Sequence, residues 1–109
     1  MLERAKDFIL SRRGKIAPIV TEKLKKLLDK HPNTEKVYLL GSYANGDWVD
    51  EQTPEWFKDF RRSIGKRKHI SDVDFYVEPW VPPIEGEYDI LDFPRGSQIL
   101  IYDNGKTIL

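Results

Sequence analysis

The chain of 109 residues contains no cysteine and only two histidines, His31 and His69. Without cysteine there can be no disulfide, no thiolate metal site and no cysteine nucleophile. Two histidines are too few for a histidine-rich metal centre, and nothing in the spacing of serine, histidine and aspartate suggests a catalytic triad. These absences exclude zinc-thiolate and cysteine-dependent chemistry.

Long apolar runs are also missing, and none approaches the length that crosses a bilayer. The first residues are charged and lack the apolar core of a signal peptide. We therefore expect a cytoplasmic protein without membrane attachment, and the lack of cysteine fits that compartment.

An excess of either charge is absent, because 18 basic residues balance 18 acidic ones. Overall charge therefore does not favour nucleic acid as the partner. The distribution is uneven: residues 1–36 carry ten basic against five acidic side chains, and residues 78–109 carry two against six. Such a polar chain could form a head-to-tail homo-oligomer or dock a basic partner through its acidic end, although solvated faces explain the same pattern.

The length fits one domain, residues 1–109. Apolar spacing predicts helices over 2–13 and 16–30, and strands over 36–40, 70–77 and 87–93. Asn104-Gly105 between apolar runs predicts a hairpin of residues 98–102 and 106–109. The fold class is therefore α+β, with a mixed or antiparallel sheet and two N-terminal helices packed on one face.

A split motif carries the chemistry. Gly41-Ser42 follows a buried strand and opens a short helix, and Asp72-Val73-Asp74 comes later on a second strand. Alternate side chains of a strand share a face, so Asp72 and Asp74 point the same way and repel each other unless a cation lies between them. Oxygen ligands suit Mg²⁺ or Mn²⁺, and backbone N–H groups of the turn suit phosphate. The pattern predicts metal-assisted chemistry on a nucleoside triphosphate, against the alternative of a solvated polar strand and an ordinary turn.

With these residues, the chain resembles the nucleotidyltransferase superfamily typified by DNA polymerase beta, and especially its minimal nucleotidyltransferase branch. The likeness runs from about Val37 to Phe93. It implies that Gly41 and Ser42 bind the nucleotide and that Asp72, Asp74 and Asp89 are the catalytic and metal-binding residues. Asp89 would complete the site and accept the proton of an attacking hydroxyl.

Two departures from the family pattern stand out. The segment between the two half-motifs, about 49–70, is far longer than usual, and Asn45 stands where relatives often have arginine. Thr53-Pro54-Glu55 is typical of a helix start, and the apolar residues that follow recur at helical spacing. We therefore expect an inserted helix with an apolar stripe on one side. Its basic run, which contains Lys66, Arg67 and Lys68, could contact phosphate or a partner, or could be a solvated loop.

The resemblance implies a metal-dependent enzyme that moves a nucleoside monophosphate, with AMP favoured, from ATP or another triphosphate to a hydroxyl. It further implies an antitoxin whose partner is a small helical, toxin-like protein, modified on tyrosine or neutralised by binding. The alternative is a non-catalytic module of the same fold that neutralises or scaffolds a partner protein. The two departures favour this alternative, and the acidic residues oppose it.

Overall fold

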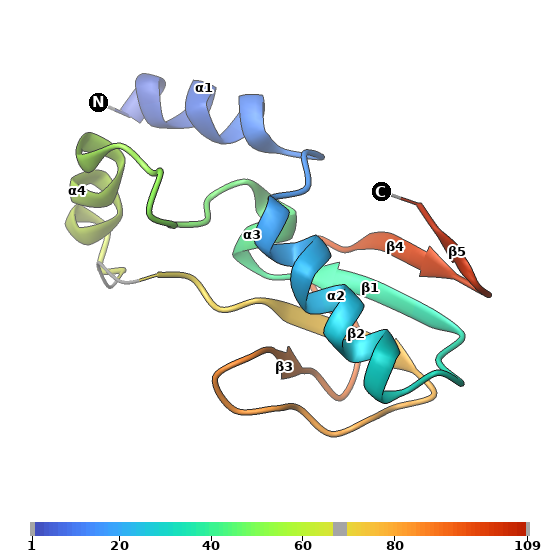
Figure 1. Cartoon of the computed structure of the whole chain (residues 1–109). Helices are drawn as coiled ribbons and strands as arrows, with labels where there is room; N and C mark the ends of the chain where they lie inside the picture. The colour runs from blue at the N-terminus through green and yellow to red at the C-terminus, as the bar shows by residue number, and fades with distance from the viewer. Residues whose placement is uncertain (1, 67–69, 109) are drawn as a thin grey trace.

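The computed structural model describes residues 2–66 and 70–108 as four helices and a five-stranded mixed sheet (Figure 1). The helices are α1 Leu2–Arg12, α2 Pro18–Lys30, α3 Ser42–Asn45 and α4 Glu55–Ser63. The strands are β1 Lys36–Leu40, β2 Asp74–Glu78, β3 Asp89–Ile90, β4 Ile99–Asp103 and β5 Lys106–Thr107. Their order is β3-β2-β1-β4-β5, and only β2 and β3 run parallel. The α+β class is confirmed.

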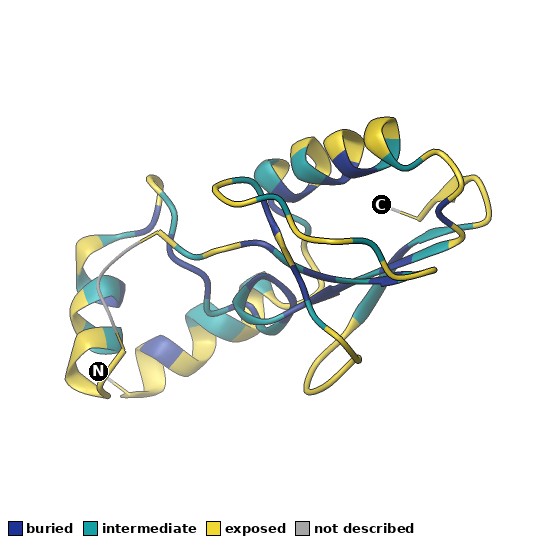
Figure 2. Ribbon diagram, turned by 90° about the horizontal axis from the view of Figure 1, so that it is seen from below, coloured by how far each residue is buried: buried dark blue, intermediate teal, exposed yellow. Residues whose placement is uncertain are grey.

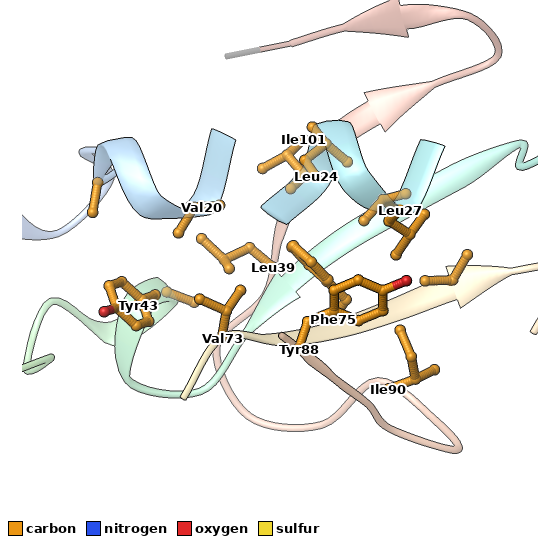
Figure 3. Close-up of a cluster of buried hydrophobic side chains, with 14 of the residues drawn as sticks. Val20, Leu24, Leu27, Leu39, Tyr43, Val73, Phe75, Tyr88, Ile90 and Ile101 are labelled. Atoms are coloured by element: carbon orange, nitrogen blue, oxygen red, sulfur yellow. The ribbon is translucent and has the colours of Figure 1, made fainter. Parts of the chain in front are cut away.

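The core lies between α2 and one face of the sheet (Figure 3). Val20, Leu24 and Leu27 recur at helical spacing and are buried, so α2 presents a continuous apolar stripe. Alternate residues of the central strands meet that stripe, namely Val37 and Leu39 from β1 and Phe75 and Val77 from β2. Burial of this stripe and of the strand faces holds the helix on the sheet.

The other long N-terminal helix, α1, extends beyond the sheet and packs against α4 (Figures 1 and 2). The ring of Phe8 lies 5.3 Å from that of Trp56 and 4.6 Å from that of Phe57. The guanidinium of Arg4 lies 4.0 Å from the Trp56 ring. The segment 49–70 thus contains a helix, α4, whose aromatic side chains pack against α1.

Two strands are shorter than their sequence patterns predict. β2 begins at Asp74, because the backbone of Ser71 bonds instead to Val49: the Ser71 N–H donates to the Val49 carbonyl at 2.8 Å, and the Val49 N–H donates to Ser71 Oγ at 2.9 Å. β3 contains only Asp89 and Ile90, since these two residues alone pair with β2.

The C-terminal hairpin forms as predicted. Asn104 and Gly105 take the left-handed conformation, with φ of 46° and 88°, which a two-residue turn of this kind requires. None of the helices in the described ranges has the length and apolar character needed to cross a membrane.

Candidate functional site

The two central aspartates of the site come from neighbouring strands. Asp74 and Asp89 are the first residues of β2 and β3, and they are register partners in the parallel pair. Register partners present their side chains on the same face of a sheet. The backbone N–H of Asp89 donates to the carbonyl of Val73 at 2.9 Å, which holds the start of β3 beside the start of β2.

Asp72 lies just before β2 rather than within it. The alternation nevertheless continues, because Val73 is buried while Asp72 is exposed and Asp74 is half-buried. Burial, followed by the carboxylates of Asp89 and Asp72, raises the pKa of Asp74 to about 6. Asp72 and Asp89 are therefore close enough to Asp74 to disfavour the charged form of its carboxyl group.

Gly41 reaches the same place from β1. Leu40 is the register partner of Asp74, so Gly41 lies where β1 ends and β2 starts. Its φ of +70° favours glycine, and a Cβ built on it would lie 2.5 Å from Asp74 Oδ2. The Asp74 carboxylate therefore occupies space that any side chain at residue 41 would need.

Ser42 is the first residue of α3 and is half-buried. Gly41 takes the N-cap position, and its carbonyl accepts the N–H groups of Ala44 and Asn45, both at 3.0 Å. The Gly41-Ser42 turn thus lies next to Asp74, but α3 has only four residues and supplies a weak dipole.

A cavity of about 440 Å³ opens beside the acidic residues. Its lining includes Ile19, Lys23, Tyr43, Asp72, Ile84 and Asp89. The Lys23 ammonium lies 2.8 Å from the Glu87 carboxylate, so its charge is already paired. The cavity therefore combines apolar side chains from α2 and the loop before β3 with the carboxylates of Asp72 and Asp89, which form no ion pair with a residue in the ranges 2–66 and 70–108.

An aromatic stack supports the wall of this cavity. Tyr43 is buried, and its ring stacks on Trp48 at 5.5 Å and 14°. The guanidinium of Arg12 lies 3.6 Å from the Trp48 ring and donates to the Trp48 carbonyl at 2.9 Å. Arg12 in the last turn of α1 thus holds Trp48, which stacks on Tyr43 of α3, the short helix that begins at Ser42.

One member of the predicted basic run approaches this loop. The Lys66 ammonium lies 3.0 Å from Asp47 Oδ2, while Arg67 and Lys68 lie outside the described residues. The carbonyl of Asn45 accepts a hydrogen bond from Arg13 Nε at 3.2 Å. Residue 45 therefore contacts Arg13, which directly follows α1, and Lys66 is a cation beside Asp47 in the same loop.

The acidic residues fit a hard divalent cation in their chemistry. Carboxylate oxygens are the ligands that Mg²⁺ and Mn²⁺ take. Burial and then the carboxylates of Asp89 and Asp72 raise the pKa of Asp74, and a bound cation would stabilise the charged form that they disfavour. Within residues 2–66 and 70–108, however, no three histidine or acidic side chains are already gathered as metal ligands. Asp74 and Asp89 are the residues that would hold the ion, with Asp72 nearest in the chain.

Two arginines near the site have no signal in the motif. Arg95 lowers the pKa of Asp74, against the larger effects of burial and of the two carboxylates, so it lies within electrostatic range. It comes from the exposed loop between β3 and β4, far from the motif in sequence. Arg12 is the last residue of α1, and the helical spacing of the sequence indicates on which side of the helix it lies but not what it contacts. No local pattern connects either arginine to Asp74 or Trp48.

No family model matches this chain, and no match was found among the curated proteins or the solved structures.

Proposed function

We propose that this protein is a metal-dependent nucleotidyltransferase that moves a nucleoside monophosphate, with AMP favoured, from a triphosphate to a hydroxyl. The observation that carries the proposal is the meeting of Asp74, Asp89 and Gly41 at one end of the sheet. The three residues lie at the ends of three different strands. Asp74 is the register partner of Asp89, and its carboxylate lies 2.5 Å from where a Cβ on Gly41 would be. The split motif supplies Gly41 and Asp74 of this arrangement, and the resemblance to nucleotidyltransferases supplies Asp89.

Each residue has a role in this proposal. Asp74, Asp89 and Asp72 would hold Mg²⁺ or Mn²⁺, which when bound neutralises phosphate charge and stabilises the leaving pyrophosphate. Gly41 lets the chain turn beside the Asp74 carboxylate, and the half-buried Ser42 lies beside it for a phosphate contact. Asp89, which is exposed, accepts the proton of the attacking hydroxyl. Arg95 and Lys66 are the nearby cations that would take the place of an arginine at Asn45.

The acceptor belongs to the proposal as well. A minimal transferase of this kind would act as the antitoxin of a toxin–antitoxin pair, with a small helical protein as its partner. The support for this part of the proposal is the small size of the described unit, which consists of one sheet, one helix that covers it and a helical pair beside it.

Binding of Mg²⁺ and ATP tests the proposal directly. We expect calorimetry to show Mg²⁺-dependent binding of ATP to the wild type, and Asp74→Asn to abolish the dependence on Mg²⁺. Asp29→Asn is the matched control, because Asp29 is exposed on α2. Equal responses of wild type and Asp74→Asn would refute the metal site.

A second candidate function is a non-catalytic binding module of the same fold. It is favoured by the missing ready-made metal cluster in the described ranges and by the position of Asp72 outside β2. Labelled ATP with a candidate acceptor discriminates between the two. Transfer that is lost in Asp89→Asn supports the enzyme, whereas acceptor binding without transfer supports the module.

A further inference from the structure

The second face of the sheet has no helix over it in the described part of the chain. α2 lies over one face of the sheet (Figure 2), the face formed by Val37 and Phe75. The alternate residues of the same strands therefore point away from α2. Tyr38 of β1 lies between its register partners Tyr76 of β2 and Leu100 of β4. We call these three residues, all half-buried, the tyrosine face.

The tyrosine face is an aromatic platform that continues to one side. The rings of Tyr38 and Tyr76 lie 6.0 Å apart and are tilted by 41°. Tyr76 also lines a groove of about 470 Å³ with Glu78, Trp80 and Asp92, and Trp80 is 51% exposed. Aromatic side chains gathered on a surface in this way are typical of sites that bind another chain.

Carboxylates surround this platform. Lys36 has Glu78 and Asp103 as its register partners, and Lys106 of β5 in turn pairs with Asp103, so the two lysines on this face each lie beside an acidic residue. Asp74 adds a third acidic group on β2, and Asp92 adds another at the groove. A single-stranded nucleic acid would stack on tyrosines, but its phosphates would meet these carboxylates.

We propose that the tyrosine face docks a basic amphipathic segment of a partner polypeptide, and that this segment presents the hydroxyl that receives the nucleotide. Apolar side chains of the segment would cover Tyr38, Tyr76 and Leu100, and its lysines or arginines would meet the surrounding carboxylates. Charge complementarity selects a basic polypeptide among the possible occupants.

The platform is continuous with the candidate site. Asp74 and Tyr76 are two residues apart on the same face of β2, a separation of about 7 Å along a strand. A segment docked on the tyrosine face therefore reaches the acidic pair. The identification of that segment as the acceptor rests on the proposed function, whereas the docking itself rests on the face.

A synthetic amphipathic peptide, with lysines on one side and leucines and one tyrosine on the other, tests the docking. In two-dimensional NMR of the full chain, we expect it to shift the amide signals of Tyr38, Tyr76, Trp80 and Leu100. We expect Tyr38→Ala with Tyr76→Ala to weaken binding about tenfold, as for the anchors of an interface. Glu78→Gln with Asp103→Asn should weaken binding at low salt and reduce its dependence on salt.

Controls keep the result specific. Leu10→Ala should leave the affinity unchanged, because Leu10 is exposed on α1 away from the sheet. Thermal unfolding is recorded for each variant, and Trp80→Ala replaces the double tyrosine variant if that variant does not fold. The same peptide with glutamates in place of the lysines should not bind.

Three outcomes would overturn the docking proposal. One is a set of shifts confined to α1 and α2, and another is an oligouridylate that occupies the tyrosine face as tightly as the peptide. The third is a dimer, seen by sedimentation, that dissociates when Tyr38 and Tyr76 are replaced. Mg²⁺–ATP affinity is measured on the same samples: if ATP binds and the peptide does not, the docking proposal alone fails, whereas peptide binding without ATP binding overturns the acceptor assignment and the proposed function.

Discussion

Asp74 is held in surroundings that oppose its charge. The side chain is half-buried, and the carboxylates of Asp89 and Asp72 add to the effect of burial. Folding therefore raises its pKa from 3.8 to about 6. A group that is unfavourable in its charged form, in a place where a cation would relieve it, is typical of a functional site.

The raised pKa of Asp74 predicts that replacement of this residue increases the free energy of unfolding, and that the increase depends on pH. Between pH 3.8 and about 6 the folded state binds more protons than the unfolded state, so the free energy of unfolding falls as pH rises. Asparagine does not titrate, so the stability of Asp74→Asn does not fall with pH for this reason. We expect Asp74→Asn to exceed the wild type in the free energy of unfolding by urea at pH 8, and the difference to vanish near pH 4 or below.

Asp29→Asn, on the exposed side of α2, should show no such pH-dependent gain. Addition of Mg²⁺ at pH 8 should narrow the gap by stabilising the wild type alone. If Asp74→Asn is no more stable than the wild type at pH 8, the carboxylate is not in the environment described.

Substitution of Gly41 can separate two reasons for the glycine: its positive φ and the nearness of the Asp74 carboxylate. Alanine at residue 41 would be strained at φ +70° and would place its Cβ 2.5 Å from Asp74 Oδ2. We expect Gly41→Ala to lower the free energy of unfolding by more than the roughly 1–3 kcal/mol that a strained backbone costs. In an Asp74→Ala background the cost should shrink by at least about 0.5 kcal/mol, because the clash is gone.

Gly65→Ala is the matched control for this double-mutant cycle. Gly65 has a φ of +87°, but a Cβ there would meet nothing within 4 Å. It should carry the backbone cost alone and show no coupling to residue 74. Equal costs of Gly41→Ala with and without Asp74 would show that the two residues do not share this space.

Among the elements, the pair α1 and α4 forms a small unit beside the sheet. The apolar stripe of α4 predicted a docked helix, and the residue that is most buried there is Phe57, at 0% exposure. Its contact with Phe8 could not be read from the sequence, since helical spacing indicates which side of a helix is apolar but not which surface covers it.

We expect Phe57→Ala to lower the free energy of unfolding by about 3 kcal/mol, because it leaves a cavity between α1 and α4. Hydrogen exchange should rise more in α1 and α4 than in β1, since the lost contacts belong to the helical pair. Ile64→Ala, at a side chain that is 55% exposed, should change the free energy by less than about 0.5 kcal/mol. Uniform loss of protection across β1 would contradict a separate helical unit.

For the molecule as a whole, ion pairs tie α2 to the loop before β3. The Glu87 carboxylate lies 2.8 Å from the ammonium groups of both Lys23 and Lys26. These hydrogen bonds lower the pKa of Glu87 from 4.5 to about 2. The loop that leads to Asp89 is thereby attached to the helix that covers the core.

Glu87 should therefore stabilise the folded state more as pH rises, whereas Asp74 should destabilise it more as pH rises. The lowered pKa of Glu87 means that its contribution is present above pH 4.5 and is lost as pH falls toward 2. We expect Glu87→Gln to be less stable than the wild type at pH 7 and equally stable near pH 2, as measured by thermal or urea unfolding. Glu85→Gln, at an exposed neighbouring carboxylate, should match the wild type at both pH values.

Local patterns were sufficient for much of the architecture. The apolar stripe of α2, the five residues of β1 and the Asn104-Gly105 turn each depend on neighbours in sequence, and each lies where its pattern predicts. The shared face of Asp72 and Asp74 also follows from local sequence, because alternation along one segment sets the side to which each side chain points.

Contacts between distant segments required the tertiary structure. The sequence could propose Asp89 only through a resemblance, and its register with Asp74 follows from parallel pairing of β2 with an edge strand of two residues. The short extent of β2 follows from hydrogen bonds between Ser71 and Val49, and the nearness of Arg95 to Asp74 from the path of an exposed loop. None of these has a periodic signal, because each depends on which surfaces meet after the chain has folded.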